Sequence, residues 1–256
     1  MSMQYFWGAY FFGIGAAVGS FLNVVIYRVP KGESIVKPGS HCPSCNTPIK
    51  AYHNIPIISW LMLRGKCASC GAGFSPRYML VELLTALLFA ACWARFGIGA
   101  ASFVYMAFCA AMVAVVFIDL DHLIIPDAIT LPGIVVGFVC SYLFLPIAMS
   151  DALYGFLAGG GIFFLLALLV PGGMGGGDIK LMGMVGAFLG LKAALITIFL
   201  GSLVGAIGGI IGMVALGKGR KSKIPFGPYL VVGALTALFF KDQVIDTYFR
   251  LFVPGY

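Results

Sequence analysis

Long apolar runs, separated by short polar or glycine-rich segments, occupy almost the whole chain. Runs of about 18 or more apolar residues are typical of membrane-spanning helices. The pattern predicts eight spans, at about 5–25, 79–94, 101–118, 129–145, 153–170, 179–189, 194–216 and 228–240. The run at 179–189 is too short to cross a core of about 30 Å unaided. It is expected to be buried among other helices, tilted differently from them, or continuous with the next run.

One long polar segment, which contains two cysteine pairs, interrupts this pattern after the first span. We therefore expect an all-α polytopic membrane protein with a small cytoplasmic zinc-ribbon-like insert. Its predicted parts are a first transmembrane helix at 1–27, a four-cysteine zinc-binding insert at 28–78 and a multi-helix membrane domain at 79–256. The first run lacks a basic segment before it and a small-residue cleavage site, so we expect a retained span instead of a signal peptide.

Composition agrees with a membrane location: 61% of residues are hydrophobic and 10% are charged, and the mean hydropathy is +1.04. A soluble domain is excluded by these values. The net charge of +7 does not indicate a nucleic-acid partner, because Lys and Arg in membrane proteins mainly fix orientation. With the N-terminus outside, 12 of the 16 Lys and Arg residues fall on the cytoplasmic side. The four that fall outside are Arg95, Lys192, Lys241 and Arg250.

The insert carries Cys42 and Cys45 in one C-x-x-C pair and Cys67 and Cys70 in a second, with 21 residues between the pairs. Two such pairs are typical of a tetrahedral Zn²⁺ site. Two disulfides are the alternative, which a reducing cytosol disfavours. Four thiolates leave no open coordination position, so the predicted zinc is structural.

Four of the nine acidic residues lie at the predicted cytoplasmic edges of spans: Asp119, Asp121, Asp127 and Asp178. Two carboxylates held close together share a proton, so that one acts as a general base on water and the other as an acid toward a carbonyl oxygen. This chemistry hydrolyses a peptide bond without a covalent intermediate. Asp119 directly extends an apolar run, and Asp178 lies beside a glycine-rich stretch, so these two are the predicted pair.

Five glycines lie between Pro171 and Asp178, among them Gly175 and Gly177. Such a stretch suits a segment against which an extended substrate backbone must lie. Asp178 as a mere helix N-cap is the plain alternative. A nucleotide-phosphate loop is disfavoured, because no register gives G-x-G-x-x-G and no strand precedes the stretch.

Other polar residues near the membrane edges are supporting candidates. Asp121 is expected to point away from Asp119 if the helix continues, and Asp127, after a proline, is expected to be an N-cap. Lys180 either tunes the aspartates or extends to the interface. Glu82 lies just inside the second span, where a carboxylate indicates function.

These motifs closely resemble those of the bacterial type IV prepilin peptidases, which are bifunctional leader peptidases and N-methyltransferases. The resemblance covers nearly the whole chain. It rests on the segments 19–30, 54–61, 77–82, 118–127 and 175–180 and on the four cysteines. Gly175-Gly176-Gly177-Asp178 matches the G-x-G-D motif of intramembrane aspartyl proteases.

The resemblance implies that Asp119 and Asp178 are catalytic and that the protein resides in the inner membrane. It further implies cleavage of the short basic leader of type IV prepilins or type II secretion pseudopilins. Methylation of the new N-terminus with S-adenosyl-L-methionine is also implied. The sequence contains no Rossmann-like unit, so the site for this methyl donor cannot be assigned from sequence. It likewise leaves the oligomeric state open.

Two other classes of function remain as alternatives. Membrane carboxylates also relay protons or bind cations in transporters and channels, although those are expected near the midplane and in internal repeats. A scaffold that docks a partner through the zinc insert is the other alternative.

Overall fold

The computed structural model describes residues 2–170, 173–216 and 224–252, and in these ranges the regular elements are helical. Two compact units form, Met1–Ala114 and Val115–Tyr256, with the boundary inside helix α4 (Ala100–His122). Six of the described helices are long and apolar enough to cross a membrane. The predicted all-α polytopic class is confirmed. Residues 217–223, which follow the predicted span at 194–216, and Pro171 lie outside the described residues.

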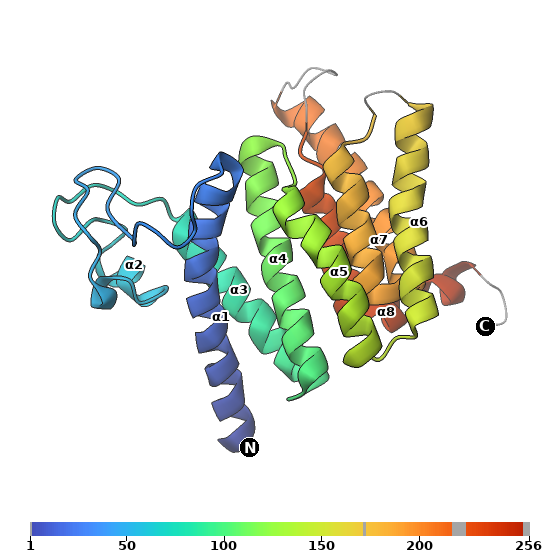
Figure 1. Ribbon diagram of the computed structural model, residues 1–256, viewed down its shortest axis with the longest axis horizontal. Coiled ribbons are helices and arrows are strands. Elements are labelled where there is room, and N and C mark those ends of the chain that lie inside the picture. Colours follow the sequence, from blue (N-terminus) through green and yellow to red (C-terminus); the bar gives the residue numbers. More distant parts are fainter. Residues whose placement is uncertain (1, 171–172, 217–223, 253–256) are drawn as a thin grey trace. The chain divides into compact units, whose positions relative to one another are not determined.

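Unit 1 is built on α1 (Ser2–Arg28) and α3 (Arg77–Phe96), which cross each other (Figure 1). The backbones approach closely because Gly19 has no side chain: a Cβ atom there would lie 2.6 Å from Cα of Glu82. Small residues at helix crossings are the usual means of close packing in lipid. Toward the N-terminus of α1, the rings of Phe11 and Trp93 stack with centroids 6.4 Å apart.

The insert of unit 1 joins α1 to α3 and contains only short helical turns. These are η1 (Val29–Lys31), η2 (Ala51–His53) and α2 (Ile58–Met62). Isolated bridges pair His41 with Pro48 and Lys66 with Gly73, one around each cysteine pair. Arg28 is buried, and its guanidinium donates to the carbonyl oxygens of Ser34 at 2.9 Å and Pro38 at 2.8 Å. Polar contacts, more than apolar packing, therefore hold this segment.

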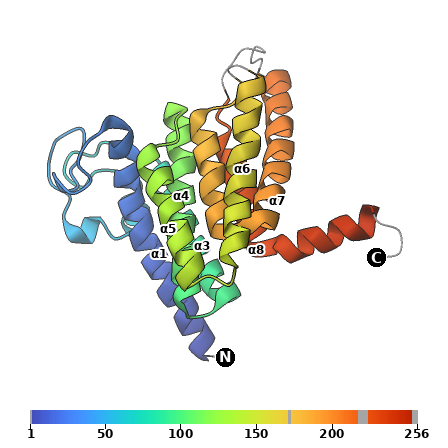
Figure 2. The ribbon, with the colours of Figure 1, turned by 45° about the vertical axis from the view of Figure 1, so that its right-hand side comes forward.

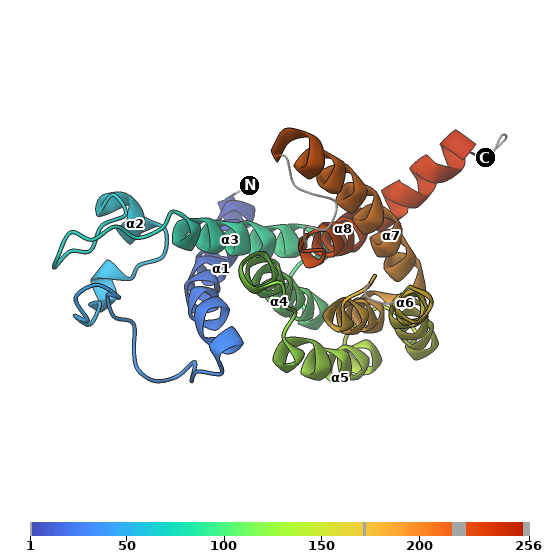
Figure 3. The same cartoon turned by 90° about the horizontal axis from the view of Figure 1, so that it is seen from above.

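Unit 2 contains the end of α4 and four further helices. They are α5 (Asp127–Leu143), α6 (Met149–Leu169), α7 (Gly176–Leu216) and α8 (Gly227–Phe252). Figure 3 shows α5 and α6 beside the first half of α7, seen end on. Every residue from 181 to 190 is buried. The short run at 179–189 is therefore buried among other helices, which was one of the three arrangements expected for it.

Helix α7 is interrupted at Gly190, whose φ of 80° and ψ of −179° are not helical. This conformation is open essentially to glycine alone. Asp151 of α6 lies against Gly190 and accepts a hydrogen bond from the N–H of Leu191 at 3.2 Å. The carboxylate thus accepts a hydrogen bond from the first N–H of the second half of α7. It acts as an N-cap would, although it belongs to another helix.

Helix α8 bends at Phe240, and its last part leaves the direction of the first (Figure 2). The first part packs against the second half of α7, where a Cβ atom at Gly233 would lie 2.7 Å from the carbonyl oxygen of Thr197. The first residue of α8, Gly227, thereby has a fixed position within the unit.

Candidate active site and metal centre

Asp119 occupies the last turn of α4 and is 5% exposed. The helix continues past it to His122, which also leaves Asp121 exposed, as expected from the helical period. Oδ2 of Asp119 accepts a hydrogen bond of 2.9 Å from the backbone N–H of Gly227. Because Gly227 begins α8, the carboxylate lies at a helix N-terminus, where backbone N–H groups favour an anion.

Asp178 is the third residue of α7 and is half-buried. Its backbone N–H donates to the carbonyl oxygen of Gly175 at 3.1 Å, and its carboxylate turns back onto the backbone of Gly175, to which it hydrogen-bonds. The alternative of a simple N-cap does not describe this position, because Asp178 lies inside the first turn. Like Asp119, its carboxylate lies beside the N-terminus of a helix, where an anion is favoured.

The two carboxylates approach closely enough to interact electrostatically. Ile125, in the connection after α4, fills the space between the segments that carry them. Its side chain would lie 2.8 Å from a Cβ atom at Gly177 and 3.3 Å from one at Gly227. Three helix ends therefore meet around Asp119 and Asp178. A Cβ atom would be too close to Ile125 at Gly177 and too close to Asp119 at Gly227, where it would lie 2.7 Å from Oδ2. We call these two aspartates with Gly175 and Gly227 the carboxylate site.

Gly227 is the member of this site that the sequence did not reveal. Its signal was the sequence Phe226-Gly227-Pro228 before the last apolar run, since proline near the first helical position marks a helix start. Nothing in that pattern indicates which side chain the helix start would receive.

Lys180 and Asp127 form an ion pair beside the carboxylate site. Nζ of Lys180 lies 2.7 Å from both carboxylate oxygens of Asp127, with side chains 38% and 55% exposed respectively. The prediction that Asp127 is an N-cap was wrong: Pro126 holds that position, and Asp127 is the first residue of α5. The proline fixes its own φ and so sets the helix start one residue earlier.

Glu82 belongs to unit 1, where its carboxylate lies under the insert. Oε2 accepts a hydrogen bond of 2.7 Å from the backbone N–H of Ile57, and the Ser20 hydroxyl hydrogen-bonds the same carboxylate. Ile57 has φ of 63°, which a β-branched residue rarely adopts. Glu82 therefore holds a strained turn of the insert onto the helix pair α1 and α3.

The four cysteines of the insert are brought together as predicted. Their Sγ atoms all lie within 4.8 Å of one another, and those of Cys42 and Cys70 are 3.8 Å apart. A Zn–S bond of about 2.3 Å requires an S···S separation of about 3.8 Å in a tetrahedron. All four are free thiols, so the alternative of two disulfides finds no support in this structure. The donor set and its dimensions thus fit a metal ion such as zinc.

Contacts within this thiol cluster shift the pKa values of its members in both directions: the neighbouring thiols, Cys45 foremost, raise the pKa of Cys70 to about 11. The Thr47 hydroxyl and backbone lower the pKa of the Cys45 thiol from 9.0 to about 6. Backbone N–H groups of Cys70 and Ser69 lower the pKa of Cys67 as well. Thiolates, not thiols, are the metal ligands.

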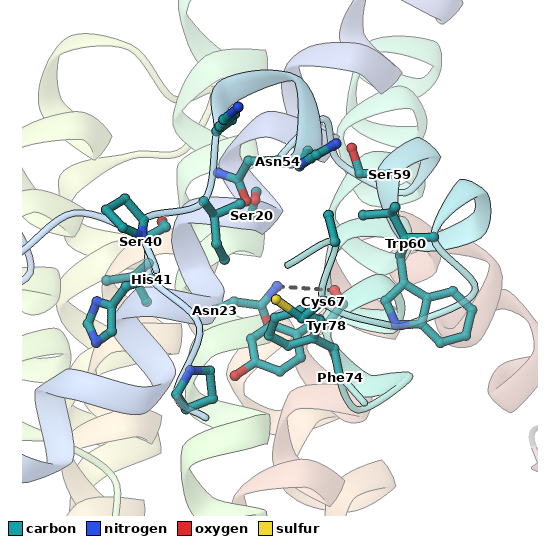
Figure 4. A pocket seen from close by; sticks show the side chains of 18 of the residues that line it. Ser20, Asn23, Ser40, His41, Asn54, Ser59, Trp60, Cys67, Phe74 and Tyr78 are labelled. Atoms are coloured by element: carbon teal, nitrogen blue, oxygen red, sulfur yellow. Dashed lines mark hydrogen bonds between the residues drawn. The ribbon is translucent and has the colours of Figure 1, made fainter. Parts of the chain in front are cut away.

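A cavity of about 690 Å³ lies in unit 1 between α1, the insert and the start of α3 (Figure 4). Ser20 and Asn23 reach it from α1, Tyr78 from α3, and Cys67 connects it to the thiol cluster. Asn23 also donates to the carbonyl oxygen of Tyr78 at 3.1 Å, which ties the two helices together at the cavity.

Fold and site together define a polytopic membrane protein with a carboxylate pair at its helix ends and a cluster of four thiols that could hold a metal ion. Residues 14–96 match the bacterial peptidase A24 N-terminal domain, and residues 105–210 match the type IV leader peptidase family. No solved structure matches the chain.

Curated relatives extend over almost the whole chain. A prepilin leader peptidase/N-methyltransferase of Aeromonas hydrophila is 39% identical, with 92% of this chain and 91% of that protein covered. Proteins of the same name from Pseudomonas aeruginosa and Neisseria gonorrhoeae are 37% and 38% identical, with at least 90% of each chain covered. The chain therefore belongs to the type IV leader peptidase family and is a multi-pass inner-membrane protein. The predicted resemblance is confirmed, and the transporter alternative finds no support.

Proposed function

We propose that this protein is an aspartyl endopeptidase that removes the leader of type IV prepilins or pseudopilins, with Asp119 and Asp178 as its catalytic carboxylates. The observation that carries the proposal is the meeting of these two side chains at the ends of α4 and α7. The two residues are far apart in sequence and come together at helix ends, and the proposal takes these ends to lie at one membrane edge that water and an unwound peptide can reach. The relatives' common name supports the same activity.

In the proposed reaction, one carboxylate takes a proton from water, and the resulting hydroxide attacks the carbonyl carbon of the scissile peptide bond. The other carboxyl group donates its proton to the carbonyl oxygen. The carbon–nitrogen bond then breaks, and the leaving nitrogen takes up a proton. The backbone N–H of Gly227 fixes the orientation of Asp119 and the backbone of Gly175 that of Asp178. Neither carboxylate therefore needs to reorganise during the reaction.

Residues 173–177 offer the most suitable surface for the substrate backbone. Gly173, Gly175 and Gly176 are exposed, and they directly precede Asp178. An extended peptide can approach such backbone more closely than it could approach side chains. The distribution of Lys and Arg supports a cytoplasmic location for this edge, with the N-terminus outside.

Methylation of the new N-terminus is the second proposed activity, and it rests on the relatives' name. S-adenosylmethionine would supply the methyl carbon: the amine nitrogen bonds to it as the carbon–sulfur bond breaks, the electron pair stays on sulfur, and the amine releases a proton. We propose that the thiol cluster holds structural Zn²⁺, since four thiolates leave no coordination position for a substrate.

Cleavage of a purified prepilin in detergent tests the peptidase proposal. Asp119→Asn and Asp178→Asn should each lower the rate at least 10²-fold, because the amide keeps the shape but cannot accept or share the proton. Asp246→Asn makes the same chemical change at an exposed position of α8 and should cleave normally. Near-normal cleavage by either site variant would show that the pair is not the catalytic unit.

A further inference from the structure

The last part of α8, residues 241–252, leaves the helix bundle of unit 2. The helix bends at Phe240, whose φ of −131° and ψ of 20° are not helical. Figure 2 shows this part pointing away from α6 and α7, and Figure 3 shows it lengthwise, in a view that looks down α6. It therefore runs across the direction of the membrane helices of its unit. We call residues 241–252 the α8 tail.

The α8 tail begins at one edge of the membrane helices. A Cβ atom at Gly201 of α7 would lie 3.1 Å from Cα of Leu230, and one at Gly233 would lie 2.7 Å from the carbonyl oxygen of Thr197. This antiparallel register places Phe240 level with the break in α7, against which the start of α6 also packs. Because α8 starts at the carboxylate site, the tail lies at the opposite edge.

Apolar and polar residues occupy opposite faces of the α8 tail. With the helical period of about 3.6 residues, the apolar positions fall on one face and the polar positions on the other. The apolar face consists of Val244, Ile245, Tyr248, Phe249 and Leu251. The polar face consists of Asp242, Gln243, Asp246, Thr247 and Arg250, all of which are exposed. A helix with this pattern is stabilised by an apolar phase on one side and water on the other.

Exposed apolar surface continues from the membrane helices onto the α8 tail. Phe240 at the bend is 55% exposed, and Phe199 on the adjoining half of α7 is 63% exposed. Rings on the outside of membrane helices contact lipid tails, which are as apolar as the side chains themselves. On the tail, Tyr248 is 54% exposed and Leu251 is 71% exposed. The lipid-facing surface of unit 2 therefore extends along the apolar face of the tail.

The α8 tail is too short and too highly charged to cross the hydrocarbon core. Its residues 241–252 extend about 18 Å as a helix, whereas the core is about 30 Å thick. The tail also carries four charges, from Lys241, Asp242, Asp246 and Arg250, and a charged side chain in the core is costly. Its start at a helix edge and its direction across the spans instead fit the boundary between acyl chains and headgroups.

We infer that the α8 tail binds the phospholipid surface at the membrane edge opposite the carboxylate site, with its apolar face toward the acyl chains. Helices of this kind bury their apolar face about 5–10 Å into that boundary. Tyr248 suits it, because the ring can lie among acyl chains while the hydroxyl reaches the headgroups. The two basic and two acidic residues cancel, so binding depends on apolar contact and not on anionic lipid. The inference is independent of the proposed peptidase and methyltransferase activities.

Tryptophan fluorescence of the full-length protein in liposomes tests this inference. Tyr248→Trp and Thr247→Trp introduce an indole at neighbouring positions, one on each face of the tail. The liposomes contain phosphatidylcholine, either plain or brominated on the acyl chains just below the headgroups. The signal of the wild-type protein, which has three tryptophans, is subtracted.

Bromine should quench about half or more of the added fluorescence in Tyr248→Trp and little of it in Thr247→Trp. Partial replacement of the lipid by anionic phosphatidylglycerol should leave both values unchanged. Equal quenching in the two variants would show that the tail has lipid on all sides, and quenching in neither would show that the apolar face does not reach lipid. Either result overturns the inference.

Hydrogen exchange in lipid nanodiscs gives a second readout, without an added fluorophore. Tyr248→Glu should raise exchange across 241–252 about tenfold, because the ring no longer lies in lipid. Thr247→Glu, the matched change on the polar face, should exchange like wild type. Continued protection of the buried segment 181–189 shows that the bundle stays folded in both variants. Exchange of the tail in Tyr248→Glu at the wild-type rate overturns the inference.

Nanodiscs that hold one or two copies of the protein distinguish lipid from a second chain as the cover of the apolar face. Protection of 241–252 with one copy per disc supports the inference. Protection that appears only with two copies shows that a second copy covers this face, and overturns it.

Discussion

The two units organise their chemistry in opposite ways. In unit 2, glycine-rich helices pack backbone against backbone, and the carboxylates are carried at helix ends that this packing fixes. In unit 1, the insert has few regular elements, and buried polar side chains and a thiol cluster hold it in place. The peptidase site should thus tolerate changes in side-chain charge nearby but not in helix contacts. The insert should show the reverse.

Loss of the metal is the strongest test of this contrast. Cys42→Ser with Cys45→Ser should abolish zinc binding, which is worth roughly 10–16 kcal/mol in small zinc domains. Hydrogen exchange should rise throughout 32–76, while the buried part of α7 at 181–189 stays protected. Cys140→Ser, the same change in α5, should leave the zinc content at about one ion per chain.

Full zinc content in the double variant would contradict the assignment of these ligands. Loss of protection in α7 as well would show that the stability of unit 2 depends on the insert. That result would contradict the proposed difference between the two units.

A methyl group at the break in α7 should have the next largest effect. Gly190→Ala should destabilise the protein by about 3 kcal/mol, because positive φ strains alanine and the new Cβ would collide with Asp151. Gly161→Ala, where a Cβ has open space, should be neutral or slightly stabilising. Unfolding in a denaturing detergent titration measures both, and equal stability of the two variants would contradict the packing argument.

Removal of the Glu82 carboxylate, which lies under the insert, should have the third largest effect on stability. Glu82→Ala should cost about 2 kcal/mol, because the N–H of Ile57 loses a charged partner. Glu82→Gln keeps an acceptor and should cost clearly less. The hydrogen-exchange rate of the Ile57 amide, measured by mass spectrometry, should rise in Glu82→Ala only. An equal rise in both variants would show that the hydrogen bond to Glu82 does not hold this turn.

The ion pair beside the carboxylate site should have the smallest effect. A double-mutant cycle with Lys180→Met and Asp127→Asn should give a coupling energy of about 0.2–1 kcal/mol, since both side chains are substantially exposed. Both variants should cleave prepilin with the pH profile of wild type. A shifted profile in Lys180→Met alone would instead indicate that the lysine acts on Asp119 and Asp178, the proposed catalytic pair.

Sequence was sufficient wherever the signal was local. Apolar runs identified the helices, both those of membrane length and the shorter buried run before Gly190, because backbone in lipid must satisfy its hydrogen bonds internally. The C-x-x-C spacing identified the thiol cluster, because knuckles of this kind bring their sulfurs together within a few residues. The sequence also reduced the candidates for a carboxylate pair to four acids at the edges of spans, and the catalytic role of Asp119 and Asp178 among them stays a prediction.

Contacts between distant segments were decided by the tertiary structure alone. The N–H of Gly227 donates to Asp119, 108 positions away in the sequence. Lys180 pairs with Asp127 over 53 positions, and Glu82 accepts a hydrogen bond from Ile57 over 25 positions. Each of these contacts depends on which helix ends meet. The hydropathy pattern does not determine this, because many packings bury the same apolar surface. The cavity of unit 1 arises in the same way, from three segments whose polar residues carry no joint pattern in sequence.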